Sequence, residues 1–282
     1  MSTTIWFNGA LVGEPLAVDS SERGLLLGDG LFETVAVFNR VAVWLDDHLD
    51  RLMAGAVALG LPGNRLAIKN AIGEVLRAAP AAHGILRITL TRGPGLRGLA
   101  AKAVQPSLLV TLTPWTGKML FAPAMLSTSS IRRNETSPAS RLKTLSYIDN
   151  IIAAREAAMI HCDDAVFLNH QGLVASTTIA NIFVLRDGWI ATPRTSDGVL
   201  AGIARKKLLE LDNAEERPVT LQELRDAEAV FLTNSLRLVR PVHSLDGQPL
   251  GRNDAALAGL FDTLCRMIAT ETALDPREVD AL

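Results

Sequence analysis

Two kinds of segment alternate along most of this chain: some have the composition of β-strands, and others have the apolar spacing of helices. This alternation is the sequence feature that most limits the folds open to the chain. Near the N-terminus, Asn8-Gly9 supplies the positive φ angles that a two-residue turn between two strands requires. We predict strands at 5–7, 10–12, 35–38, 41–45, 85–91, 107–112, 165–168, 182–185, 189–191 and 229–233, and helices at about 46–60, 65–78, 148–158 and 254–271. Asp46 and Asp47 are expected to cap the first helix. The pattern predicts a mixed α/β protein.

The chain has 282 residues, close to the upper size for one hydrophobic core, so two domains are expected. The segment Thr113-Pro-Trp-Thr-Gly-Lys118 interrupts the alternation. We therefore predict an N-terminal domain at 1–113, a linker at 114–118 and a C-terminal domain at 119–282.

The composition excludes several classes of function. A net charge of −2 gives no basic surface for nucleic acid or an anionic membrane. Cys162 and Cys265 are too few for a disulfide framework, and the five histidines are scattered, so no metal site is expected. The sequence has no apolar segment long enough to predict a membrane span, and the N-terminus lacks the pattern of a signal peptide. We expect a cytoplasmic protein.

The segment 140–157 holds the first candidate for chemistry. Lys143 follows a polar segment and comes just before the helix predicted from about Ile148, which places its amine at the start of a helix. A lysine packed against apolar neighbours loses its proton near neutral pH and becomes a nucleophile that forms Schiff bases. The alternative is an ordinary solvated lysine, which is the commoner case.

Other polar motifs indicate anion binding or close packing. His48 and Arg51 share one face of their predicted helix because they are three residues apart. The loop 92–98 carries two arginines among glycines, and 198–205 opens a helix with unobstructed N–H groups, so both are candidate anion sites. The three glycines around Asp29 indicate close backbone packing, most simply against another strand.

From about Ile5 to Val242, these motifs together resemble the class IV aminotransferase family, the fold type IV enzymes that use pyridoxal 5′-phosphate (PLP). The family includes branched-chain and D-amino-acid aminotransferases and 4-amino-4-deoxychorismate lyase. The resemblance implies a smaller N-terminal and a larger C-terminal α/β domain with mixed sheets and the cofactor between them. It also implies a homodimer in which the 92–98 loop reaches the pocket of the neighbouring subunit.

The resemblance also assigns residue roles. Lys143, in Leu-Lys-Thr-Leu-Ser-Tyr, corresponds to the Schiff-base lysine that moves the proton at the substrate α-carbon. Arg51, in His-Leu-Asp-Arg-Leu, corresponds to the arginine that pairs with the cofactor phosphate. The other implied cofactor contacts are Leu200 on the pyridine ring, the amides of Ile203 and Ala204 and the hydroxyl of Thr233 or Ser235 at the phosphate, and Tyr147 near the phenolic oxygen.

Ser176 departs from the family pattern, which places a glutamate against the pyridine nitrogen at this position. A hydroxyl cannot hold a protonated pyridine as a carboxylate does. Three explanations are open: Asp163 or Asp164 replaces the glutamate, the enzyme works with a neutral ring, or the site has lost activity. Both aspartates precede a strand, so we expect them to face solvent.

Several local details resemble the aminodeoxychorismate lyase branch most, among them Gly28-Asp-Gly-Leu-Phe-Glu-Thr34 and the 92–98 loop. In that branch two basic residues, matched here by Arg87 and Arg97, hold the carboxylates of the substrate. Leu99 replaces an aromatic residue frequent in the lyases, so an aminotransferase of branched-chain L-amino acids or of D-amino acids is the alternative. Ser176 alone would also allow a non-catalytic PLP-binding protein.

Overall fold

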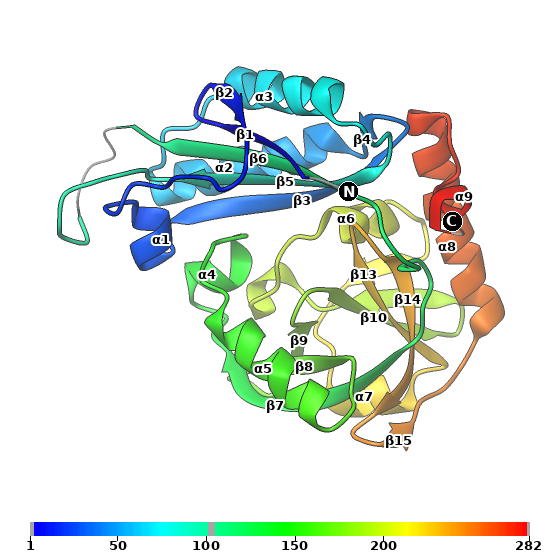
Figure 1. Ribbon diagram of the computed structural model, residues 1–282. Helices are drawn as coiled ribbons and strands as arrows, with labels where there is room; N and C mark the ends of the chain where they lie inside the picture. The colour runs from blue at the N-terminus through cyan, green and yellow to red at the C-terminus, as the bar shows by residue number, and fades with distance from the viewer. Residues whose placement is uncertain (1–2, 101–104, 281–282) are drawn as a thin grey trace. The chain divides into compact units, whose positions relative to one another are not determined.

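The computed structural model describes residues 3–100 and 105–280, and the chain divides into two compact units (Figure 1). Unit 1 consists of Met1–Gly117, Leu142–Ser146 and Ile268–Leu282, and unit 2 of Lys118–Arg141 and Tyr147–Met267. The predicted C-terminal domain, 119–282, therefore contains two segments that belong to unit 1. One of them carries Lys143.

Unit 1 is built on a six-stranded sheet in the order β2-β1-β6-β5-β3-β4, with every neighbouring pair antiparallel. The predicted hairpin at its edge is confirmed, because Asn8 and Gly9 both have positive φ, 44° and 110°. The strands are β1 (Thr4–Phe7), β2 (Ala10–Val12), β3 (Gly30–Phe38), β4 (Val41–Ala42), β5 (Gly84–Thr91) and β6 (Ser107–Pro114).

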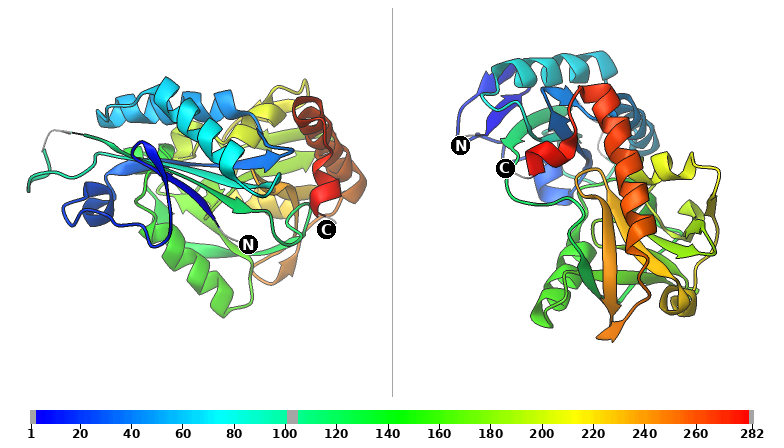
Figure 2. Two further views of the ribbon diagram at one scale, coloured as in Figure 1. Left: turned by 45° about the horizontal axis from the view of Figure 1, so that its top comes forward. Right: turned by 90° about the vertical axis from the view of Figure 1, so that its right-hand side faces the viewer.

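Two helices, α2 (Leu45–Leu59) and α3 (Arg65–Ala78), lie across one face of this sheet, as the left-hand view of Figure 2 shows. Their apolar faces bury residues such as Leu49, Leu52, Ile68 and Ile72 in the core of the unit. The unit also contains α1 (Arg23–Leu27), α9 (Pro276–Asp280) and the last turn of α8 (Asp254–Thr272).

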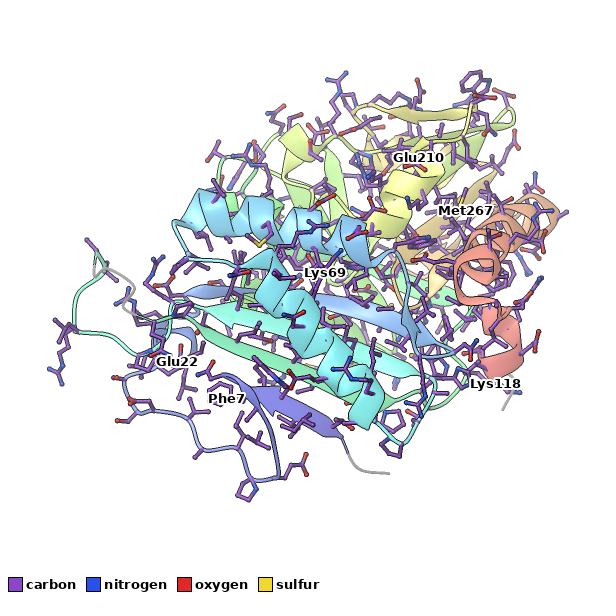
Figure 3. The ribbon with its side chains drawn as sticks, turned by 90° about the horizontal axis from the view of Figure 1, so that it is seen from above. Phe7, Glu22, Lys69, Lys118, Glu210 and Met267 are labelled. Carbon is purple, nitrogen blue, oxygen red and sulfur yellow. The ribbon has the colours of Figure 1, made fainter. Side chains whose placement is uncertain are left out.

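The start of α2 differs from the prediction. Trp44 holds the N-cap position but does not cap the helix with its side chain, and the two aspartates lie inside the first turn. Asp46 instead accepts ion pairs from Arg65 and Lys69 on α3, 2.9 and 2.7 Å away; Lys69 is labelled in Figure 3. The carboxylate therefore joins two helices at the surface, where it adds little stability.

Glu22, also labelled in Figure 3, joins α1 to the ends of two strands. Its carboxylate is 5% exposed and accepts from the N–H of Gly24 and from the hydroxyls of Thr91 and Ser107. A buried carboxylate needs such donors because an unmatched charge is costly to bury. The contact fixes the segment that leads into β3.

Unit 2 is built on a nine-stranded mixed sheet in the order β12-β11-β10-β13-β14-β7-β8-β9, with β15 paired to β14. The pairs β14·β7, β7·β8 and β11·β12 are parallel. The strands are β7 (Ala124–Arg133), β8 (Asp164–Asn169), β9 (Val174–Thr177), β10 (Asn181–Arg186), β11 (Trp189–Thr192), β12 (Ala214–Glu216), β13 (Ala229–Asn234), β14 (Leu238–Leu245) and β15 (Gln248–Pro249).

The two faces of this sheet bury different clusters. One face buries residues such as Val166, Val230 and Leu232. The opposite face packs Phe167 and Ala165 of β8 against Ala153 and Ala157 of α5 (Ile148–Met159). The stacked rings of Phe183 and Phe231, 5.0 Å apart between centroids, join β10 to β13. The other helical segments are α4 (Pro138–Arg141), η1 (Thr195–Asp197), α6 (Ile203–Leu209), α7 (Leu221–Asp226) and the main part of α8. Both units are mixed in α and β structure, as the sequence predicts.

We expect substitution of Gly55 by valine to destabilise the protein by about 1–3 kcal/mol, because the core around it has no room for a larger side chain. A Cβ atom at Gly55 of α2 would lie 2.9 Å from Cδ1 of Leu31, which is 2% exposed. Gly259→Val is the matched control, since Gly259 lies in α8 with open space around its Cβ position. Urea unfolding measures both, and equal effects of the two substitutions would contradict the tight α2–β3 contact.

Candidate active site

The segment Leu142–Ser146 extends along an edge of β3 that β4 leaves unpaired. The N–H of Phe32 donates to the carbonyl of Lys143 at 2.9 Å, and the N–H of Leu145 donates to that of Gly30 at 3.0 Å. These two hydrogen bonds flank the bridge between Leu31 and Thr144. Lys143 is therefore held in extended backbone against β3, five residues before α5 begins, rather than at the start of a helix as predicted.

The Phe32 ring carries two cations. Nζ of Lys143 lies 4.4 Å from its centroid, and Cζ of Arg87, on the neighbouring strand β5, lies 4.0 Å from it. Phe32 is 7% exposed, so neighbouring residues pack around its ring and hold it in place. The negative face of an aromatic ring attracts cations, which lets two like charges approach one another. The structure thus brings two predicted site residues, Lys143 and Arg87, to one ring.

The amine of Lys143 is easier to deprotonate than an ordinary lysine. Burial is the main cause, the guanidinium groups of Arg51 and Arg87 act in the same direction, and Glu33 opposes them, so that the pKa of Lys143 falls to about 8. At pH 7 to 8 a substantial share of the amine is therefore neutral and nucleophilic. The prediction of a lysine with a lowered pKa is borne out.

Glu33 is the buried acid of this group. It is 0% exposed and lies on β3, facing α2. Arg51 donates to both of its oxygens, from Nε at 2.8 Å and from Nη2 at 2.5 Å, and Nδ1 of His48 lies 2.7 Å from Oε2. His48 and Arg51 share a helix face, as their spacing predicts, and that face meets the carboxylate.

The charges of this trio are fixed by their contacts. Burial alone would raise the pKa of Glu33, but the charge and hydrogen bonds of Arg51 and the bond from His48 outweigh it and lower this pKa to about 2. Burial lowers the pKa of His48, more than Glu33 raises it. A neutral His48 donates from Nδ1 to the carboxylate, which leaves Nε2 as a buried acceptor without a hydrogen bond among the described residues.

The arginines of the glycine loop differ from one another. Arg92 donates to Asp29 at 2.7 Å and to the carbonyls of Leu59 and Gly60, so it fastens the loop to unit 1. Nε of Arg23 donates to the same oxygen of Asp29 at 2.9 Å. Arg97 is exposed, and its predicted contact with substrate stays a prediction.

The predicted phosphate-binding helix in unit 2 begins later than expected. Gly202 is the N-cap of α6, without a side-chain cap, and Ile203 and Ala204 form its first turn. A Cβ atom at Gly202 would lie 2.0 Å from Oδ1 of Asn181, so only glycine allows this approach. The amide of Asn181 donates to the carbonyl of Leu200 at 2.9 Å and holds the segment before the helix.

Ser176 lies on β9 with its hydroxyl directed to the carbonyl of Thr177 at 3.1 Å. Its register partner is Phe167, and the guanidinium of Arg133 stacks on the Phe167 ring at 4.1 Å. Burial lowers the pKa of Arg133, while Asp149 and Tyr147, the N-cap residue of α5, raise it. The sheet face that carries Ser176 therefore holds a half-buried cation.

Asp164 corrects a sequence-based expectation. It is 2% exposed, not solvent-facing, and its Oδ1 accepts from Thr178 and from the N–H of Ala165. Asp163 is exposed, as expected, and pairs with Arg240 at 3.1 Å. Strand residues an odd number apart face opposite sides, so Asp164 faces away from Phe167 and its partner Ser176. Asp164 is therefore not the acid that replaces the missing glutamate.

Thr233 and Ser235, the alternative phosphate ligands, also differ. Thr233 is 1% exposed, and its hydroxyl has no hydrogen bond within the described part of the chain. Ser235 is partly exposed in the turn after β13.

Phe32 and Glu33 belong to the motif 28–34, but the sequence indicates no role for either residue. The one indication was that Glu33 is a charged residue in a mostly apolar strand, which predicts a buried acid that needs partners. In the described ranges 3–100 and 105–280, no group of His, Cys, Asp and Glu side chains could hold a metal ion, and no helix is long and apolar enough to span a membrane.

Comparisons with known proteins agree on a family but not on one activity. The family described as amino-transferase class IV matches residues 30–245. The D-alanine aminotransferase of Bacillus licheniformis is 29% identical, spanning 88% of this chain and 90% of that protein. The aminodeoxychorismate lyase of Bacillus subtilis is 27% identical, spanning 91% and 93%. The branched-chain aminotransferase structure from Thermoproteus uzoniensis is 25% identical with a TM-score of 0.88, covering 95% of each chain. The predicted fold class and enzymatic nature are confirmed.

We expect Glu33→Gln to destabilise the fold by about 3–5 kcal/mol, since it removes the counter-charge of the largely buried Arg51 guanidinium. Glu33 is 0% exposed, and Arg51 donates two hydrogen bonds to it. Glu156→Gln on the exposed face of α5 is the control and should change stability by less than about 0.5 kcal/mol. Urea unfolding of both variants measures the difference, and a neutral Glu33→Gln would show that the carboxylate does not hold α2 on β3.

We also expect stability to depend on pH through Lys143. Its pKa is about 8 in the fold against 10.5 for the ordinary group, so between these values the unfolded chain binds a proton that the folded chain has lost. The free energy of unfolding, relative to that of Lys143→Met, should be flat below pH 8 and rise by about 2–3 kcal/mol up to pH 10.5. The measurement is urea unfolding across this range with the amine unmodified. A constant difference between the two proteins would contradict the lowered pKa.

Proposed function

This chain belongs to the class IV aminotransferase family, and we propose that it is a 4-amino-4-deoxychorismate lyase, which releases pyruvate and leaves 4-aminobenzoate. Enzymes of this family use PLP, and this chain is therefore a PLP-dependent enzyme. The proposal places the enzyme in the formation of a folate precursor in the cytoplasm.

The residues present fit this cofactor. Lys143 offers a primary amine whose pKa is about 8, the group that an aldehyde requires. In unit 2, α6 begins without a side-chain cap, and its first amides are those of Ile203 and Ala204, as a phosphate group requires. When bound, PLP supplies an electron sink that makes the carbon next to the amino group acidic.

We assign the roles as follows. Lys143 holds the cofactor and accepts the proton from the carbon that bears the substrate amino group. Arg51, oriented and partly neutralised by Glu33, is assigned to the phosphate. Leu200 packs on the pyridine ring, Ser235 completes the phosphate contacts, and Tyr147 lies near the phenolic oxygen. Arg87 and Arg97 bind the two substrate carboxylates.

The observation that carries the lyase assignment is the Phe32 ring with Arg87 and Lys143 on it. A carboxylate paired with Arg87 would lie close to the amine of Lys143, because both groups lie within 4.4 Å of the ring centroid. Guanidinium groups bind carboxylates through paired hydrogen bonds, and 4-amino-4-deoxychorismate carries two carboxylates. The lyase relative from Bacillus subtilis is similar to this chain over 91% of its length.

Ser176 supports elimination over amino-group transfer. The Ser176 hydroxyl donates to the Thr177 carbonyl, and the Arg133 guanidinium lies on the same sheet face, so Ser176 supplies no negative charge that would hold a proton on the pyridine nitrogen. We therefore propose a neutral ring and a weaker electron sink. A weaker sink hinders transamination, which needs a long-lived carbanion, more than elimination, where formation of the aromatic product drives the step.

The second candidate is an aminotransferase of branched-chain L-amino acids or D-amino acids. The names of the Thermoproteus uzoniensis and Bacillus licheniformis proteins favour it, since both are similar to this chain over most of its length. In that case Arg87 would bind the single carboxylate of the amino acid.

We expect the enzyme to be a homodimer. Exposed apolar side chains on α5 support this: Ile148, Ile151 and Met159 are 63%, 51% and 81% exposed. Leu25 and Leu26 on α1 are 69% and 61% exposed. Such surfaces are typical of contacts between protein chains.

We predict that the purified enzyme releases 4-aminobenzoate from 4-amino-4-deoxychorismate faster than it forms glutamate from leucine or pyruvate from D-alanine in the presence of 2-oxoglutarate. Lys143→Ala should abolish turnover and the absorbance band that borohydride fixes to residue 143. Arg87→Met should raise KM for the dicarboxylate by on the order of 10-fold or more, since it removes a charge-assisted pair. Arg77→Met, in the last turn of α3, is the control. Full turnover by Lys143→Ala would refute the mechanism, and dominant transamination would favour the second candidate.

A further inference from the structure

Arg23, the first residue of α1, holds the far end of the 92–98 loop with its side chain. It is 4% exposed, and it donates from Nη1 to the carbonyl of Gly98 at 2.7 Å and from Nη2 to that of Leu99 at 3.1 Å. The ion pair of its Nε with Asp29, at 2.9 Å, compensates the buried charge. All three nitrogens of the guanidinium are therefore engaged, two of them with the backbone of the loop.

The start of the loop also packs on Arg23. The backbone N–H of Arg23 donates to the carbonyl of Gly93 at 3.1 Å. A Cβ atom at Gly95 would lie 3.0 Å from Cδ of Arg23, so a larger residue there would crowd its side chain. Backbone on both sides of Arg97 is thus fixed to one buried residue.

The side chains at the end of the loop project outward, in contrast to its backbone. Leu96 and Leu99 are 84% and 86% exposed, and Arg97 is exposed between them. In the described ranges, the Arg97 side chain has no hydrogen bond or ion pair. A loop with a fixed backbone presents such a side chain in a limited set of directions, which reduces the entropy that is lost when the side chain binds a ligand. This arrangement is typical of a binding loop.

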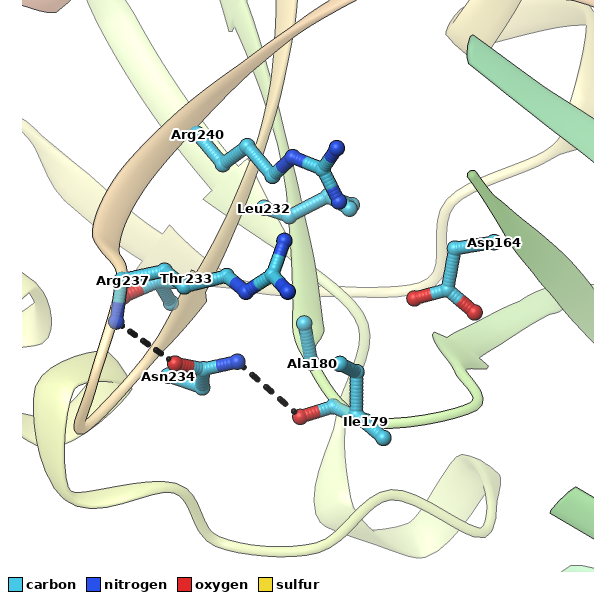
Figure 4. Close-up of a pocket in the computed structure, with 8 residues that line it drawn as sticks. All are labelled: Asp164, Ile179, Ala180, Leu232, Thr233, Asn234, Arg237 and Arg240. Atoms are coloured by element: carbon cyan, nitrogen blue, oxygen red, sulfur yellow. Dashed lines mark hydrogen bonds between the residues drawn. The ribbon is translucent and has the colours of Figure 1, made fainter. Parts of the chain in front are cut away.

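Arg240 in unit 2 has the same pattern of contacts (Figure 4). It is buried, pairs with a carboxylate at 3.1 Å and donates to two consecutive carbonyls, those of Ala122 and Pro123, at 2.9 and 3.0 Å. The neighbours of these two residues in the sequence are uncharged, whereas Arg97 directly precedes Gly98. The buried arginine of α1 therefore differs in holding the backbone next to an exposed cation.

We propose that Arg23 is a positioning residue for substrate, which fixes the loop backbone so that Arg97 meets the second carboxylate of the substrate. The inference rests on the proposed function, in which Arg97 binds that carboxylate. Without the contacts of Arg23, Arg97 keeps its charge but must be ordered each time substrate binds. The cost falls on KM for a substrate with two carboxylates rather than on kcat, because neither arginine is assigned to the reacting carbon.

Tryptic cleavage of the bond between Arg97 and Gly98 tests the loop contact in the full-length holoenzyme, whichever reaction the enzyme catalyses. A protease must draw the carbonyls of Gly98 and Leu99 away from Arg23 to bind this segment. We expect Arg23→Met to be cut there about 10-fold faster than the wild type, as measured by mass spectrometry. Arg40→Met is the matched control and should be cut at the wild-type rate, because Arg40 donates to two backbone carbonyls elsewhere in unit 1. Equal rates for Arg23→Met and the wild type would overturn the proposal.

A double-mutant cycle with Arg97→Met separates positioning from a general loss of stability. Arg23→Met should raise KM for 4-amino-4-deoxychorismate by on the order of 10-fold and change kcat by less than about 2-fold. The double variant should have the KM of Arg97→Met alone, because both substitutions act on one carboxylate contact. Additive effects on KM would show that Arg23 acts through something other than Arg97, and the proposal would be wrong.

Thermal unfolding checks that each variant is folded. If Arg23→Met is not, Arg23→Lys takes its place, since lysine keeps a positive charge beside Asp29 but lacks the planar fork that reaches two carbonyls. It should lose both the protection from trypsin and the affinity, and wild-type behaviour of Arg23→Lys would contradict the proposal.

The two proposals can fail separately. A wild type that does not convert 4-amino-4-deoxychorismate refutes the proposed lyase but not the loop contact. The cycle is then measured on KM for 2-oxoglutarate, which also carries two carboxylates. If no assay shows turnover, the cleavage rates alone decide whether Arg23 holds the loop.

Discussion

The burial of the Glu33 carboxylate is the constraint on which the arrangement around Lys143 depends. A fully buried carboxylate stays ionised only if cations and hydrogen-bond donors reach it, and here Arg51 and His48 do so from one face of α2. The contact fixes α2 against β3. It also offsets the Arg51 charge that would otherwise lower the pKa of the lysine further, so one carboxylate supports both the fold of unit 1 and the reactivity of its amine.

The strand β3 makes a different contact of the site on each of its two faces and along its edge. Glu33 faces the helices, Phe32 on the opposite face carries the cations of Lys143 and Arg87, and the free edge near Gly30 pairs with the segment 142–146. Because side chains alternate along a strand, adjacent residues serve different surroundings within a few ångströms. A shift of β3 by one residue would exchange the two faces and remove the site.

Two of the buried acids, Glu33 and Asp164, illustrate different outcomes of the same cost. Glu33 has both oxygens matched by protein groups, which lowers its pKa to about 2 and makes it part of the fixed framework. Asp164 has one oxygen matched and one left open beside the Arg237 guanidinium, which lacks an ion pair in the described residues. A complete set of partners indicates a structural role, whereas an oxygen without a protein partner needs a donor from outside the chain, for which one water molecule is enough.

The sequence by itself determined the local elements and the chemical identity of the central amine. The hairpin at Asn8-Gly9 and the helices near 46–60 and 65–78 follow from backbone preferences within a few residues, and all are present. Motifs with characteristic spacing identified Lys143. Only the tertiary structure decided that 142–146 belongs to unit 1, that Asp164 is buried and that Glu33 joins His48 to Arg51. These outcomes depend on which distant segments pair and in which register, and periodicity within one segment carries no information about its partner.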